Sequence, residues 1–64
     1  MPKYHVEEMD GDTVMATHLV SASTPLRAAQ EATERSVTLR TTGPIWIRLT
    51  DEQRGHVFEY SFSP

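Results

Sequence analysis

Apolar and polar residues alternate along residues 45–62, and this pattern predicts a β-hairpin. A four-residue loop over 52–55 would end on Gly55, where a left-handed backbone costs glycine nothing. Pairing Asp51 with His56 across this loop places six apolar residues on one face: Ile45, Ile47, Leu49, Phe58, Tyr60 and Phe62. The outer face then holds Trp46, Arg48, Thr50, Val57, Glu59 and Ser61.

A second alternating pattern covers residues 3–9 and 13–20, and Asp10-Gly11 between them indicates a type I′ hairpin turn. Pairing Met9 with Asp12 gives one apolar face made of Tyr4, Val6, Met15 and Leu19. The other face is mixed and consists of His5, Glu7, Val14, Ala16, His18 and Val20.

Helical spacing follows over residues 25–35. Thr24 is the expected N-cap, and Pro25 suits the first helical position, where an N–H is not needed. Glu31 and Arg35 have the spacing and order of a favourable ion pair. The inner face should be narrow and small: Leu26, Ala29, Ala32 and Thr33.

Residues 36–42 are rich in β-branched types and predict a short strand, which Gly43-Pro44 turns into the hairpin at 45–62. The order of elements is therefore β-β-α-β-β-β. We expect an α+β fold with an antiparallel sheet and one short helix packed on one face. Residues 1–64 form a single domain.

Composition limits the function. The 64 residues carry a net charge of −3 and no cysteine, which excludes disulfides and thiolate metal sites. No apolar stretch approaches the ~20 residues of a membrane span, and no signal-peptide core is visible, so we expect a cytoplasmic protein without membrane contact. A domain this small usually needs a stabilising partner. A homodimer is the simplest one.

Candidate chemistry is sparse. In the expected register His5 and His18 share a face near Glu7, but a structural zinc site wants four ligands, so no metal site is predicted. Asp10, Asp12, Asp51 and Glu52 suit turns, where their side chains bond the local backbone. No nucleophile motif or phosphate loop is present, and a 64-residue monomer leaves no room for a substrate pocket. We therefore predict no catalytic residue, no cofactor and no enzymatic activity.

Nucleic-acid binding has one supporting fragment, because Trp46 with Arg48 and Arg40 nearby could stack a base. The acidic balance and the scattered basic residues argue against it.

Residues 23–62, STPLRAAQEATERSVTLRTTGPIWIRLTDEQRGHVFEYSF, resemble small bacterial domains of unknown function. The shared features are a capped alanine-rich helix, a W-I-x-L/V-T-D-E strand, a glycine turn and an aromatic last strand. This resemblance implies no activity or site residues. The chain is also similar to HicB-type antitoxin subunits, which begin with a hairpin followed by a helix opening at a threonine, as at Thr24. It lacks their usual glycine before that threonine and their DNA-binding tail, and it has an extra hairpin.

Our hypothesis is a non-enzymatic domain that associates with itself or with another protein through Trp46, Arg48, Val57 and Glu59. Trp46 would be the apolar anchor, and Arg48 and Glu59, paired across the hairpin, would fix the register of the contact. Trp46→Ala would then weaken association and leave the fold intact. Trp46 could instead be a core residue under a loop or the N-terminus. The alternative function is a nucleic-acid-binding or antitoxin-like regulatory module.

Overall fold

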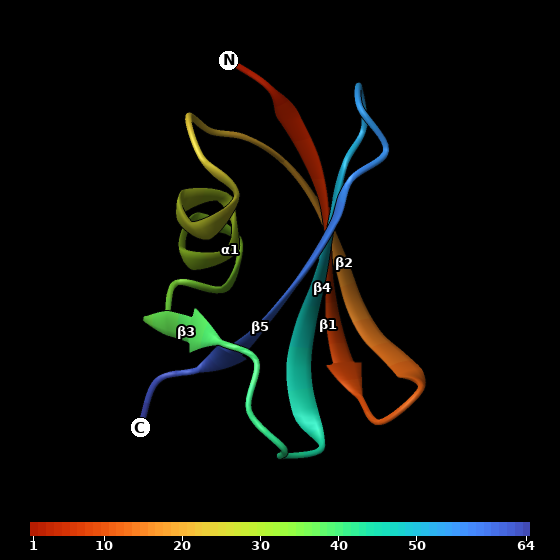
Figure 1. Ribbon diagram of the computed structural model, residues 1–64, viewed down its shortest axis with the longest axis vertical. Coiled ribbons are helices and arrows are strands. Elements are labelled where there is room, and N and C mark those ends of the chain that lie inside the picture. Colours follow the sequence, from red (N-terminus) through yellow and green to blue (C-terminus); the bar gives the residue numbers. More distant parts are fainter.

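The computed structural model describes residues 1–64 and contains five strands and one helix (Figure 1). The elements are β1 (Lys3–Asp10), β2 (Thr13–Ser21), α1 (Pro25–Thr33), β3 (Val37–Leu39), β4 (Ile45–Asp51) and β5 (Val57–Phe62). This order confirms the predicted α+β architecture. The strand expected over 36–42 is shorter than predicted and covers three residues.

All five strands form one antiparallel sheet in the order β2-β1-β4-β5-β3. Helix α1 lies on one side of this sheet, and no element covers the other side (Figure 1). We call these sides the helix face and the open face. The sheet ends in two edge strands of very different length, nine-residue β2 and three-residue β3. No helix has the length and apolar character that crossing a membrane requires.

The β4–β5 hairpin has the predicted register, with Leu49 opposite Phe58 and Ile47 opposite Tyr60. Gly55 ends the loop at φ +75°, and its N–H donates to the Asp51 carbonyl at 2.7 Å. The Asp51 N–H donates to the His56 carbonyl at 2.8 Å, which confirms that pair. Local turn chemistry is sufficient to set this register.

Helix α1 begins as predicted: the Thr24 hydroxyl accepts a hydrogen bond from the Arg27 N–H at 3.2 Å, and Pro25 follows. The helix ends at Thr33, two residues earlier than expected, because Glu34 takes a left-handed conformation with φ 56°. The expected Glu31–Arg35 ion pair is therefore absent. Glu31 Oε1 instead lies 3.9 Å from Arg27 Nε.

The inner side of α1 also differs from the prediction. Its buried residues are Ala28 and Ala29, with Ala32 partly buried, whereas Leu26 is exposed. Alanines allow the helix to approach the sheet closely. They pack on a core formed by Tyr4, Val6, Ala22, Val37, Ile47, Leu49 and Tyr60.

The β1–β2 hairpin departs from the predicted register. Asp10 pairs with Thr13, so Gly11 and Asp12 are the central turn residues. Only Gly11 has a positive φ, +59°, which is the pattern of a type II′ turn rather than type I′. Glu8 then pairs with Ala16 and Met9 with Val14, so β2 contains a bulge with Met15 as its extra residue.

This register overturns the predicted faces of β2. Leu19 lies opposite His5 on the open face and is exposed, as is Met15, although both were expected in the apolar face with Tyr4. Val20 instead lies opposite Tyr4 and packs against the core. His18 pairs with Val6 on the helix face, so it does not share a face with His5.

Candidate interaction surface

The open face contains a small second apolar cluster formed by Trp46 and Met9, which pair across β4 and β1. Trp46 is only 7% exposed and Met9 is fully buried. The indole Nε1–H donates to the Gly11 carbonyl at 2.8 Å, so the β1–β2 turn lies against the ring. Trp46 therefore fits the core-residue interpretation, in which a loop partly covers it.

Arg40, directly after β3, covers the remaining surface of the tryptophan. Its guanidinium carbon lies 3.9 Å from the centre of the Trp46 ring, in cation–π geometry. The same guanidinium donates to Glu59 Oε1 at 2.8 Å, which holds it in place. Arg40 and the β1–β2 turn thus cover apolar side chains on the open face, as α1 covers them on the helix face.

Charged residues cross the open face in a row of alternating sign. Arg48 pairs with Glu7 on one side and Glu59 on the other in the strand register. The predicted register match of Arg48 with Glu59 is correct, but the Arg48 Nε–H donates to Glu7 Oε1, at 2.8 Å. The sequence could not reveal this partner, because it depends on β1 lying beside β4.

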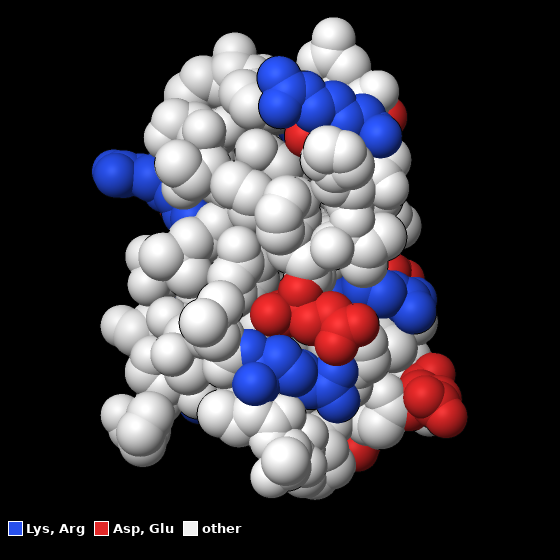
Figure 2. All heavy atoms as spheres, in the orientation of Figure 1, with Lys and Arg blue, Asp and Glu red and all other residues white.

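The Glu7–Arg48 contact also changes the proton affinity of both groups. The hydrogen bond from Arg48 holds the pKa of Glu7 below its usual 4.5, although partial burial opposes this. The hydrogen bond to Glu7 likewise raises the pKa of Arg48. In the view of Figure 2, basic and acidic groups lie side by side in the lower half, with no broad area of one sign.

The four residues predicted as an interaction surface all lie on the open face. They do not form the expected apolar patch: Trp46 is covered, whereas Val57 is 56% exposed. Val57 is also distant in the sheet from Val14, because β1 and β4 separate their strands. Since the indole is enclosed, replacing Trp46 should disturb the fold as well as the surface.

Strand β2, at one edge of the sheet, has no neighbouring strand on its outer side. It is an edge strand of nine residues without proline, lysine, arginine or acidic residues. Three of its apolar side chains are exposed, among them Leu19 at 63%; the others are Val14 and Met15. Sequence reasoning predicted this strand but not which of its side chains are exposed, because the bulge at Met15 reverses the faces expected from simple alternation.

The direction of the β2 backbone groups follows from one hydrogen bond. The Ala22 N–H donates at 3.1 Å to the carbonyl of Pro2, the residue directly before β1. Bonded and non-bonded pairs alternate in an antiparallel ladder, so Val20, His18 and Ala16 also bond toward β1. The N–H and C=O groups of Thr17, Leu19 and Ser21 therefore point outward, away from the sheet.

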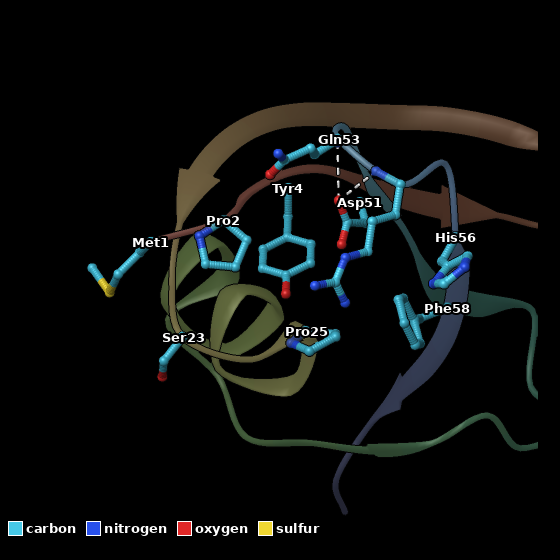
Figure 3. A pocket seen from close by; sticks show the side chains of 10 residues that line it. Met1, Pro2, Tyr4, Ser23, Pro25, Asp51, Gln53, His56 and Phe58 are labelled. Atoms are coloured by element: carbon cyan, nitrogen blue, oxygen red, sulfur yellow. Dashed lines mark hydrogen bonds between the residues drawn. The ribbon is translucent and has the colours of Figure 1, made fainter.

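A hollow of about 710 Å³ lies at the opposite end of the helix face from the β1–β2 turn. This corrects the expectation that the chain has no room for a pocket. Figure 3 shows Tyr4 between Pro2 and Asp51, with its hydroxyl directed toward Pro25. The lining residues are Met1, Pro2, Tyr4, Ser23, Pro25, Asp51, Gln53, Arg54, His56 and Phe58.

The carboxylate of Asp51, which lines this hollow, holds the β4–β5 loop. Asp51 Oδ1 accepts from the backbone N–H groups of Gln53 and Arg54 at 2.9 and 3.0 Å, as predicted for a turn aspartate. No hydrogen bond joins the Asp51 carboxylate to His56, the other titratable side chain that could act with it as an acid–base pair.

The histidines have separate surroundings. His18 Nε2 lies 2.7 Å from Glu8 Oε2, whereas His5 lies on the open face. The premise of a shared His5–His18 site is therefore wrong, and no group of three metal-ligating side chains is present.

No protein-family model, curated protein or solved structure matches this chain.

Proposed function

We propose that this protein is a non-enzymatic association domain and that its partner strand binds along the β2 edge. The observation that carries the proposal is the nine-residue β2, which has no lysine, arginine or acidic residue and has outward backbone groups at Thr17, Leu19 and Ser21. Natural sheets usually protect such edges with lysine, proline, strong bulges or very short strands. Only the Met15 bulge protects β2, and it lies near the turn.

The size of the core supports self-association. Only 13 of 64 residues are buried, so one chain has few apolar contacts to offset its conformational entropy. A second copy would add backbone hydrogen bonds and would cover Leu19. Such a partner is always present, because it is another copy of the same chain.

Nucleic-acid binding has less support than association. Arg40 and Arg48, the arginines expected beside a stacking tryptophan, each donate to a glutamate. Phosphate binding on this face would compete with those glutamates for the arginine charge. Trp46 is also covered, so its ring is not available to stack on a base.

The test is the solution mass of tag-free protein against concentration, measured by light scattering. We expect the mass to rise toward twice the 7.2 kDa of one chain. Leu19→Lys should weaken this association more than about tenfold, because it places two like charges at the contact.

Leu39→Lys is the matched control, since Leu39 is an exposed leucine on the other edge strand, β3. It should leave the mass unchanged. A protein that stays monomeric at every concentration, or a dimer lost only in Leu39→Lys, would overturn the proposal.

A further inference from the structure

We infer that two copies pair their β2 strands antiparallel in one register, with Leu19 on the two-fold axis, to form a continuous ten-stranded sheet. This inference rests on the proposed self-association and specifies its geometry. Residues of the second copy are marked with a prime below.

The outward backbone groups select this register. A two-fold axis at Leu19 places Thr17 opposite Ser21′, Leu19 opposite Leu19′ and Ser21 opposite Thr17′. All three are then hydrogen-bonded pairs, each exchanging two bonds, so every outward group between Thr17 and Ser21 has a partner. Shifting the axis by one residue toward either end pushes one outward residue past the regular part of the strand. At one end it then faces the Met15 bulge, and at the other it faces Ser23 beyond β2.

The side chains have the same symmetry. Residues 16–22 read ATHLVSA: about Leu19, Ala16 matches Ala22 and Thr17 matches the similar Ser21, whereas His18 and Val20 differ. The axis therefore places Ala16 opposite Ala22′, and the Thr17 hydroxyl opposite the Ser21′ hydroxyl. Cross-strand threonine and serine pairs stabilise sheets, and this segment has no acidic, lysine or arginine side chain to oppose itself. Such self-complementarity is what a two-fold interface requires.

Leu19 gains most from this arrangement. Its side chain is 63% exposed on the open face, with His5 as its neighbour within the sheet. Leu19′ would cover its other side. On the helix face, Val20 would lie opposite His18′, which Glu8′ holds at 2.7 Å in each copy. The exposed Leu19 thus becomes the centre of the interface.

Single cysteine variants test the register, because the natural chain contains no cysteine. Residues in a hydrogen-bonded antiparallel pair have Cα atoms about 5.5 Å apart, within the disulfide range of about 4.4–6.8 Å. Leu19→Cys should therefore form a disulfide-linked dimer under mild oxidation, visible on a non-reducing gel and reversed by reductant.

Thr17→Cys provides the matched control on the same strand and face. In the inferred register its two thiols lie four residues apart along the strand, about 13 Å, so this variant alone should not cross-link. A mixture of Thr17→Cys and Ser21→Cys chains should cross-link as the mixed pair. This mixture keeps Leu19 in place, so it tests the register even where Leu19→Cys weakens the dimer.

The outcomes separate the two proposals. A dimer by light scattering in which Thr17→Cys or Ser21→Cys cross-links alone would overturn the Leu19 register but leave self-association through β2 intact. A dimer in which no β2 cysteine cross-links would place the contact elsewhere and overturn both the inferred register and the proposed β2 contact, while self-association itself would stand. A monomer at all concentrations would overturn both.

Discussion

Ile47 and Trp46 are neighbours in β4, but they lie on opposite faces of the sheet and are shielded from water in different ways. Ile47 lies under α1 in a cluster of nine buried residues. Trp46 is covered by one arginine side chain and the turn after β1. On the helix face, packed apolar side chains exclude water. On the open face, the hydrogen bond from Trp46 to Gly11 and the guanidinium of Arg40, which forms a lid over the ring, exclude it.

This difference shows how a small domain can bury residues on both sides of a sheet with only one helix. Covering Trp46 with the side chain of Arg40 requires only one residue, whereas covering the other face requires a whole helix. The lid contributes less, because a cation–π contact at an exposed site is worth about 0.5–1 kcal/mol, whereas a buried isoleucine removes much more apolar surface from water. The following changes should therefore have unequal effects.

Ile47→Ala should have the largest effect. Ile47 is fully buried, so its replacement removes apolar contacts and leaves a cavity, at a cost of about 2–5 kcal/mol. In so small a domain this should bring much of the population to the unfolded state, as urea unfolding followed by circular dichroism would show. Ile45→Ala is the control, because Ile45 precedes it on the same strand and is half exposed; that change should stay within about 0.5 kcal/mol. Equal effects would mean that the helix face has no specific core.

Trp46→Phe should cost about 1 kcal/mol. It keeps an aromatic ring but removes the indole N–H, so the Gly11 carbonyl loses its side-chain donor. Urea midpoints at equal m-value would measure the change. Val57→Ala, on the exposed part of the same face, should have little effect. An unchanged midpoint in Trp46→Phe would show that the turn contact adds no stability.

Arg40→Ala should cost about 0.5–1 kcal/mol and expose the indole. Trp46 is the only tryptophan, so its fluorescence reports the lid directly. We expect a red-shifted emission maximum in the folded variant. Arg27→Ala on the outer side of α1 should leave the spectrum unchanged, and a matching spectrum in Arg40→Ala would argue that the lid is open in solution.

Glu7→Gln should have the smallest effect, and that effect should depend on pH. Folding lowers the pKa of Glu7 below 4.5, so the folded state favours the charged carboxylate. The resulting stabilisation is present above pH 4.5 and is lost as the pH falls through the lower folded pKa. The urea midpoints of the natural protein and Glu7→Gln should differ at pH 7 and converge at acid pH, below the folded pKa of Glu7. For Glu31→Gln, whose pair with Arg27 is exposed, the difference should be close to zero at both. A Glu7→Gln difference that does not change with pH would remove the ion pair from the account.

The elements themselves could be predicted because their signals are local. Thr24-Pro25 caps the helix, Gly55 ends the second loop, and alternation assigns the strands. The first hairpin shows the limit of such signals. Gly11 could serve either of two turn types, and the observed turn moves the partner of Met9 from Asp12 to Val14, two residues along β2. The Met15 bulge adds one further residue, and this odd shift reverses the faces of the rest of β2.

The candidate surface was predicted only in part. Alternation correctly placed Trp46, Arg48, Val57 and Glu59 on one face, because a strand has a period of two. Their exposure was not predictable, since the covering groups come from Arg40 and the Gly11 turn. The β2 edge was not visible at all, because whether a strand is central or terminal depends on the order of the whole sheet.

The sequence by itself thus determined the order of elements, the β4–β5 register and the start of α1, all of which depend on contacts between residues close along the chain. Only the tertiary structure decided that β1 lies beside β4, that Arg48 bonds Glu7 rather than Glu59, and that β2 is left as an open edge. These features depend on which of several strand pairings buries the most apolar surface with the fewest unpaired backbone groups. That competition involves the whole chain at once and leaves no mark in any single segment.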